Sequence, residues 1–298
     1  IANILSDLLK RSPTNYGDFQ DKVDAIIKNV RDNGDKAVFD YTAQFDKAEI
    51  NADNILVTEE EIKEAYEEVD DELIKVIRKA IKNIRDFHEK QIQKSWFETR
   101  EDGVMLGQKV TPMETCGVYV PGGKAVYPSS VLMNIVPAHV AGVKNIIMTT
   151  PPGKDGKVTA NTLVAAKEAG ATKVYKVGGA QAIAAMAFGT ESIPKVDKIV
   201  GPGNIFVALA KKAVYGNVSI DSIAGPSEIL VLADETANPR YVAADLLSQA
   251  EHDEMASAIL VTTSEELAHK VSDEIDGFLN QLSRNCLLYT SPSPRDIS

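Results

Sequence analysis

Gln249 and His252 are the residues whose types and spacing could hold a metal ion. They belong to the segment Ser-Gln-Ala-Glu-His-Asp at residues 248–253, which ends a predicted helix, residues 239–250, and precedes an apolar run. Residues three apart share one face of a helix. An imidazole nitrogen and an amide oxygen side by side are ligands that zinc accepts. Because the same spacing also occurs at solvated helix ends, the surrounding sequence has to decide.

Four glycine-bearing turns that follow predicted strands form a second candidate site. They lie at residues 120–123 (Val-Pro-Gly-Gly), 177–181 (Val-Gly-Gly-Ala-Gln), 200–204 (Val-Gly-Pro-Gly-Asn) and 224–228 (Ala-Gly-Pro-Ser-Glu). Ligands of open α/β sheets bind where strands end, and glycine lets the backbone approach a phosphate. None of the turns has the G-x-G-x-x-G spacing of a common dinucleotide site. Because Gln181 and Asn204 each begin a predicted helix, we expect a ligand-binding edge.

Other reactive side chains near these turns are weaker candidates. Tyr119 could place its ring against a base or sugar, or could be a core aromatic residue. Ser227 has no His–Asp pattern nearby and Gly-Pro-Ser-Glu is not a nucleophile elbow, which excludes a serine hydrolase. Cys116 has no basic neighbour, so we expect a buried apolar residue rather than a thiolate nucleophile. We interpret His139 as a core histidine and His269 as a surface residue.

The elements that would position these residues change in character at about residue 104. Before it the sequence is helical and charged, and Thr58 with Glu61 predicts a capping box. After it, β-branched runs at 117–120, 145–149, 173–177, 198–200, 229–233 and 258–262 alternate with helical segments at 129–141, 160–169, 180–188, 205–214 and 239–250. This alternation predicts mainly parallel sheets with right-handed crossovers. We therefore expect an α/β fold with two incomplete Rossmann-like domains and a helical N-terminal region.

Length and composition narrow the class of protein. A chain of 298 residues is long enough for two domains. The formal net charge of -11 argues against nucleic-acid partners, which need clustered basic residues. Two cysteines give no disulfide framework and favour a reducing compartment, and no apolar run has the length of a membrane span. We expect a cytoplasmic protein with a small-molecule substrate and without nucleic-acid or membrane partners.

The expected domain division follows the same segments. Residues 119–226 would form a Rossmann-like, cofactor-side domain. Residues 1–118 would pack with residues 227–283 as a second α/β domain. Residues 284–298 lack periodicity and look like a foreign tail, so we expect them to form no part of the fold.

Five blocks of this chain, in this order, closely resemble the histidinol dehydrogenase family. They are Gly-Val-Tyr-Val-Pro-Gly-Gly at 117–123, Val-Gly-Gly-Ala-Gln-Ala-Ile-Ala at 177–184, Gly-Pro-Gly-Asn at 201–204, Ala-Gly-Pro-Ser-Glu at 224–228 and Asp-Leu-Leu-Ser-Gln-Ala-Glu-His at 245–252. The resemblance runs from about residue 18 to 281. It implies a zinc- and NAD-dependent oxidation of L-histidinol, through an aldehyde, to L-histidine, the last step of histidine biosynthesis. It also implies a homodimer whose active sites take residues from both subunits.

The resemblance also assigns roles to individual residues. The positions that match NAD-contacting residues of the family are Tyr119, Gln181 and Asn204. The positions that match substrate-contacting residues are Ser227, Gln249 and His252, of which Gln249 and His252 also match zinc ligands.

The chain departs from the family pattern in its catalytic part. The family's acid–base pair lies in a Gly-Pro-Glu-His motif, which this sequence lacks, and Glu251-His252 matches the zinc segment instead. The remaining zinc ligands of the family, an Asp and a His, are missing as well. We therefore assign no catalytic residue and expect a truncated chain with little or no turnover. Two alternatives stay open: a non-catalytic nucleotide- or ligand-binding module, and a thiol-dependent aldehyde dehydrogenase that uses Cys116.

Overall fold

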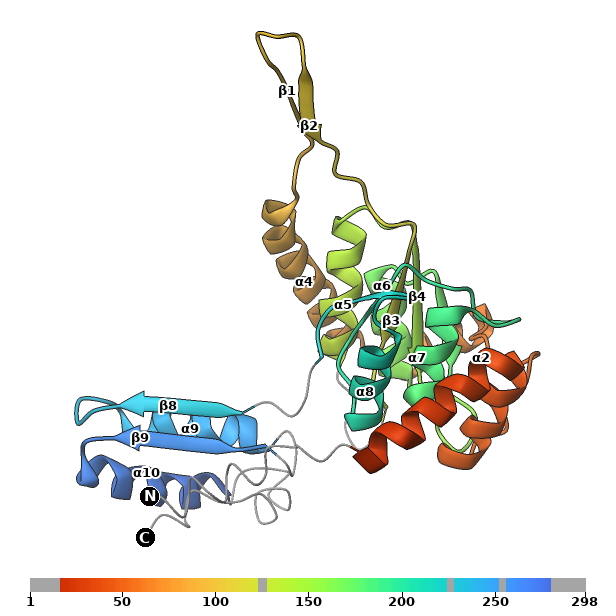
Figure 1. Cartoon of the computed structure of the whole chain (residues 1–298). Helices are drawn as coiled ribbons and strands as arrows, with labels where there is room; N and C mark the ends of the chain where they lie inside the picture. Colours follow the sequence, from red (N-terminus) through yellow and green to blue (C-terminus); the bar gives the residue numbers. More distant parts are fainter. Residues whose placement is uncertain (1–16, 123–127, 224–227, 252–255, 280–298) are drawn as a thin grey trace. The chain divides into compact units, whose positions relative to one another are not determined.

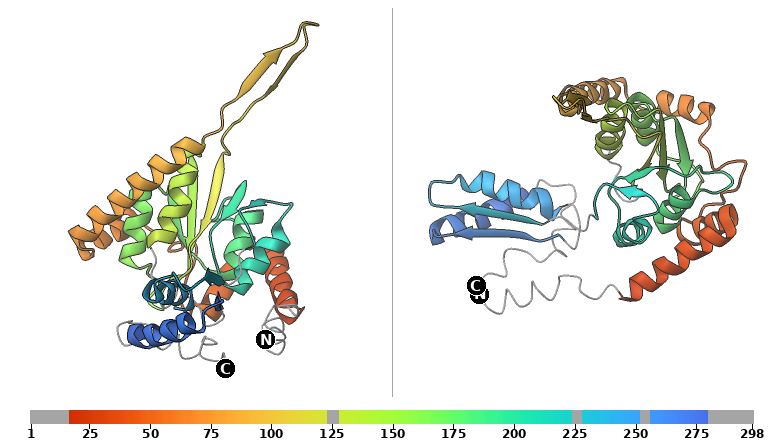
Figure 2. Two further views of the ribbon diagram at one scale, coloured as in Figure 1. Left: turned by 90° about the vertical axis from the view of Figure 1, so that its left-hand side faces the viewer. Right: turned by 45° about the horizontal axis from the view of Figure 1, so that its top comes forward.

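The structure is a computed structural model that describes residues 17–122, 128–223, 228–251 and 256–279 (Figures 1 and 2). It consists of two compact units, divided between Ile223 and Ala224, and each unit is described by itself. Both contain parallel strands and helices, which confirms the predicted α/β class.

The first unit is built on a parallel sheet of five strands in the order β5-β4-β3-β6-β7. The strands are β3 (Thr115–Tyr119), β4 (Asn145–Thr150), β5 (Lys173–Lys176), β6 (Lys198–Val200) and β7 (Ser219–Ile220). The chain adds β4 and β5 on one side of β3 and then crosses to β6 on the other side. This is a Rossmann-like order, and its topological switch point lies between β3 and β6.

Helices cover both faces of this sheet. On one face lie α5 (Pro128–Val140) and α6 (Ala160–Ala169), and on the other lie α7 (Gly179–Phe188) and α8 (Ile205–Val214). Side chains of β3 alternate between the two cores: Cys116 and Val118 belong to the first and Tyr119 to the second. This alternation is the period of a strand that is buried on both sides.

The helical N-terminal region is present and packs within the first unit. It comprises α2 (Gly17–Phe45), α3 (Glu59–Glu68) and α4 (Asp71–His88). Helix α2 contacts α7 and α8, whereas α3 contacts α6 and α4 contacts α5 and α6. The N-terminal helices therefore thicken both layers over the five-stranded sheet. The expected packing of this region with residues 227–283 concerns the placement of the two units and stays a prediction.

A β-hairpin that the sequence did not predict extends from the first unit. Strands β1 (Trp96–Thr99) and β2 (Met105–Gln108) pair antiparallel, after a short 3-10 helix, Glu89–Gln91. Every residue of both strands is exposed. With neither face buried, the hairpin lacks the alternation of apolar and polar residues by which a half-buried strand is recognised.

The second unit contains two parallel strands, β8 (Ile229–Ala233) and β9 (Ala258–Thr262), with α9 (Pro239–Ala250) and α10 (Glu265–Leu279). Asn238 caps α9, because its side chain accepts from the Arg240 N–H at 3.0 Å, and Pro239 follows at the first helical position. The helices and Ile229, Val231 and Leu260 share one core. On the other face of the sheet, Leu230 and Leu232 are 62% and 77% exposed, although parallel sheets usually have both faces covered.

Most element bounds agree with those expected from the sequence, and α6, α8, α9, β6, β8 and β9 agree residue for residue. Within the described ranges, no helix is both long and apolar enough to cross a membrane.

The capping box of α3 gives a stability prediction. The Thr58 hydroxyl accepts from the Glu61 N–H at 3.2 Å, and the Glu61 carboxylate accepts from the Thr58 N–H at 2.9 Å. We expect Thr58→Ala to lower the free energy of unfolding by about 1 kcal/mol, because the Glu61 N–H loses its acceptor and the reciprocal pair of hydrogen bonds is broken. Urea denaturation measures the loss. Thr58→Ser keeps the acceptor and serves as the control, and equal stability of the two variants would contradict the assignment.

Candidate functional site

A cavity of about 700 Å³ lies in the first unit, where the strands of the sheet end. Residues that follow β3, β4, β5 and β6 line it, including Gly122, Pro151, Gly179 and Asn204. The end of α2 completes the wall. The cavity therefore spans the topological switch point between β3 and β6, where ligands of doubly wound sheets bind.

Glycines allow the turns around this cavity to approach one another. Gly201 has φ +118°, and a Cβ atom there would lie 2.0 Å from the carbonyl oxygen of Tyr119. A Cβ at Gly122 or Gly178 would come within 2.4 Å or 2.5 Å of the Pro151 ring. Any side chain at these three positions would push strand ends apart, so the cavity edge depends on bare backbone.

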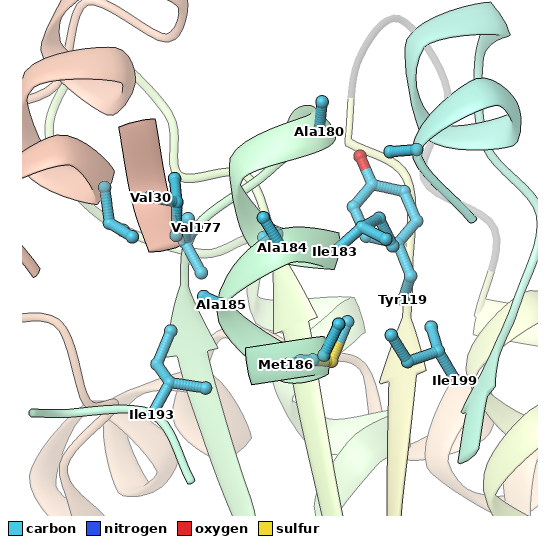
Figure 3. Close-up of a cluster of buried hydrophobic side chains, with 14 of the residues drawn as sticks. Val30, Tyr119, Val177, Ala180, Ile183, Ala184, Ala185, Met186, Ile193 and Ile199 are labelled. Atoms are coloured by element: carbon cyan, nitrogen blue, oxygen red, sulfur yellow. The ribbon is translucent and has the colours of Figure 1, made fainter. Parts of the chain in front are cut away.

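Tyr119 forms part of the cavity wall from within the core. Its ring is buried among residues of the second core, beside Ala180 and Ile183 of α7 (Figure 3). The hydroxyl accepts from the Gly179 N–H at 3.1 Å, at the first turn of α7. Burial raises the pKa of Tyr119 to about 12, so the phenol is neutral at physiological pH. The side chain thus links the end of β3 to the α7 N-terminus.

Gln181 is the polar group that the protein itself leaves unsatisfied. The residue is 1% exposed, lines the cavity, and neither its side-chain oxygen nor its side-chain nitrogen has a hydrogen-bond partner. A buried amide without partners is costly, and buried polar groups are nearly always paired. A ligand with one donor and one acceptor would satisfy both atoms of this amide.

Asn204 caps α8, since its side-chain oxygen accepts from the Val207 N–H at 3.2 Å.

The turn before Asn204 is held by an ion pair that the sequence did not predict. Lys211, 2% exposed, donates to the Gly201 carbonyl at 2.8 Å and pairs with Asp221, which also accepts from the Gly201 N–H at 2.8 Å. Both backbone polar groups of Gly201 are therefore fixed. A lysine within an apolar helix was the available signal.

Asp46 is a cavity residue that sequence reasoning missed. It directly follows α2, and its Oδ2 atom is buried without a hydrogen-bond partner. Burial raises the pKa of Asp46 to about 6. In the sequence it is one acidic residue among many at the end of a charged helix, so no pattern distinguished it.

The structure tests the expected metal and substrate residues only in part. Ser227 and His252 lie outside the described residues. Gln249 is half-buried on the last turn of α9, in the second unit. Among the residues that the structure does describe, no three His, Cys, Asp or Glu side chains gather as a metal site would require. The zinc site at Gln249 and His252 therefore stays a prediction.

The structure tests the predictions for Cys116, His269 and His139. Cys116 is 4% exposed, and burial raises the pKa of its thiol to about 11, which confirms the buried apolar interpretation and disfavours a thiolate nucleophile. His269 is a surface residue, as expected. The interpretation of His139 as a core histidine was wrong, because it is exposed on the last turn of α5, after Pro137.

Comparison with known proteins identifies the family. Residues 9–294 match the family model described as histidinol dehydrogenase. The chain is 59% identical over 265 residues to the histidinol dehydrogenase of Halalkalibacterium halodurans and 61% identical over 262 residues to that of Bacillus subtilis, which covers 89% and 88% of this chain. The crystal structure of histidinol dehydrogenase from Elizabethkingia anophelis superimposes with a TM-score of 0.85 at 43% identity over 91% of this chain. The chain spans 62%, 61% and 63% of these relatives' lengths. It belongs to the histidinol dehydrogenase family.

Proposed function

We propose that the cavity of the first unit binds NAD and that the complete protein oxidises L-histidinol to L-histidine in two steps. The observation that carries the cofactor proposal is the unpaired, buried amide of Gln181 in a cavity at the switch point of the sheet. Family membership supports the choice of L-histidinol as substrate.

The residues around the cavity suit a dinucleotide. The glycine turns bring the backbone close enough for a pyrophosphate, and the N-termini of α7 and α8 offer N–H groups to it. Tyr119 and Asn204 hold the starts of these two helices in place. When bound, NAD would accept a hydride from the substrate carbon. The protein itself would orient the nicotinamide ring of the cofactor and exclude water from the site.

The substrate end belongs to the second unit in this proposal. Ser227, Gln249 and His252 would contact L-histidinol, and Gln249 and His252 would supply two zinc ligands. Zinc would orient the substrate and polarise its oxygen. The complete protein is a cytoplasmic homodimer. The alternative is a non-catalytic nucleotide-binding module, which is favoured by one observation: the cavity and its unpaired Gln181 amide are built from residues of the first unit alone.

Replacement of Gln181 tests the cofactor site. We expect Gln181→Leu to weaken NAD binding at least about tenfold, because the amide is the group left for the ligand to pair. The free energy of unfolding without ligand should stay equal or rise, since an unpaired buried amide is removed. Calorimetric titration and urea denaturation measure the two effects. Unchanged NAD affinity would contradict the role of this amide in cofactor binding, and a large loss of stability would show that Gln181 has a structural role.

Turnover separates the two functions. We expect this chain to form NADH from L-histidinol at least about a hundredfold more slowly than a full-length relative, because the family's acid–base motif is missing from its sequence. The absorbance of NADH follows the reaction. Extension of the chain with the C-terminal part of a relative should restore activity if the enzyme proposal holds. A chain that binds NAD but stays inactive after extension favours the non-catalytic module.

A further inference from the structure

Asp46 is the one acidic residue among those that line the described cavity. Its carboxylate is partly buried, and the buried Oδ2 atom has no hydrogen-bond partner. Its backbone N–H donates to the Thr42 carbonyl at 2.9 Å, which continues the last turn of α2. The following residue, Lys47, has φ +59° and directs its ammonium group to the Gln44 carbonyl at 2.7 Å. The nearest lysine in sequence therefore does not neutralise Asp46.

The position of Asp46 is set from a distant part of the fold. Helix α2 changes direction at Gly34 (φ 55°, ψ -135°), where a Cβ atom would lie 2.4 Å from the Glu191 carboxylate. That carboxylate accepts from the Asp35 N–H at 2.8 Å, and Asp35 in turn accepts from the Ser192 N–H at 3.2 Å. The second half of α2 is thereby fixed to the segment after α7, and its end is held over the cavity.

An ionised carboxylate accepts hydrogen bonds and repels anions. The ligand group beside Asp46 must therefore be an uncharged or cationic donor, and a phosphate is disfavoured there. Positive charge lines another part of the cavity wall, where Lys154 and Lys157 follow β4. Lys157 pairs with Glu64 at 3.1 Å, whereas Lys154 has no ion pair among those found in the described residues. The wall thus has an acidic part and a basic part.

The apolar side chains that line the cavity together with Asp46 indicate which portion of a dinucleotide this carboxylate faces. Ile26, Phe45 and Phe206 line the same cavity, and Phe45 immediately precedes Asp46. Flat apolar and aromatic surfaces of this kind suit a base. The donors of an adenosine are the hydroxyls of its ribose and the amino group of its base.

Rossmann-like sheets usually read this sugar with an acidic residue after the second strand. In the present sheet that strand is β4, and it is followed by Pro151, Pro152 and Gly153, none of them acidic. The next carboxylate, Asp155, accepts from the Lys157 N–H at 3.1 Å and does not line the cavity. The usual position therefore has no carboxylate, and Asp46 supplies one from the end of α2.

We propose that Asp46 accepts hydrogen bonds from the 2′-hydroxyl of the adenosine ribose and so makes the cavity selective for NAD over NADP. This inference rests on the proposed binding of NAD. Burial of the carboxylate strengthens its hydrogen bond to the hydroxyl and its repulsion of a 2′-phosphate, because the local dielectric constant is low.

Calorimetric titration of the 298-residue chain with NAD, NADP and nicotinamide hypoxanthine dinucleotide tests the inference. The wild-type chain should bind NAD at least about tenfold more tightly than NADP, because a hydroxyl that binds Asp46 is replaced by a phosphate that it repels. Asp46→Asn should reduce this preference at least about tenfold. The matched control is Asp53→Asn, an exposed carboxylate outside the cavity. The hypoxanthine analogue, which lacks the amino group of adenine, should bind like NAD.

The outcomes are distinguishable. Equal binding of NAD and NADP by the wild-type chain overturns the role of Asp46 while leaving the NAD site intact, and this measurement needs no variant to fold. The role of Asp46 is also overturned if Asp46→Asn and Asp53→Asn behave alike. It is overturned as well if the hypoxanthine analogue alone loses affinity, which would assign Asp46 to the adenine amino group. Absence of binding by all three dinucleotides overturns the proposed cofactor site itself.

Discussion

The close approach of Gly201 to the carbonyl of Tyr119 is the constraint on which the candidate site depends. It occurs at the switch point of the sheet, between β3 and β6. The chain after β3 continues to β4 on one side of β3, and it later returns to β6 on the other side. Two strand ends can meet there only because Gly201 has no Cβ atom and has a positive φ. The ion pair of buried Lys211 with the more exposed Asp221 then holds both backbone polar groups of Gly201. The hydrogen bonds from this pair to Gly201 fix one conformation of the turn, although a glycine by itself can adopt many backbone conformations.

The turns that follow the strands and the helices after them supply most of the cavity wall, and α2 with the residue after it supplies another part. The small side chains of α7 let α2 lie close against it, since six of the ten residues of α7 are Ala or Gly. The kink at Gly34 and the hydrogen bond from the Asp35 N–H to the Glu191 carboxylate set the direction of the second half of α2. A segment that looks like scaffold in the sequence thus contributes Asp46 to a site whose other residues lie mostly far later in the chain.

Local patterns predicted the elements that are buried and periodic, and missed those whose contacts are long-range. Strands such as β6, β8 and β9 and helices such as α8 have clear patterns, so their bounds follow from the sequence, whereas the two-residue strand β7 was not predicted. The exposed hairpin β1–β2 buries neither face and gives no pattern. Gln181 was expected at a helix start after a glycine turn, but its lack of partners depends on the packing of α7. The roles of Asp46 and Lys211 could not be predicted from the sequence, because the groups that surround them come together only in the folded chain.

Gln181 and Asp46 share one property that bears on function. Both present buried polar atoms to the cavity without partners, whereas the structural polar groups nearby, Tyr119, Asn204 and Lys211, are all paired. Packing alone cannot favour this distribution, because every unpaired buried group lowers the stability of the folded chain. A ligand that pairs both groups recovers that cost on binding, so the unpaired atoms mark the positions where ligand atoms belong. The paired side chains thus stabilise the turns around the cavity, and the unpaired atoms of Gln181 and Asp46 are left for the ligand.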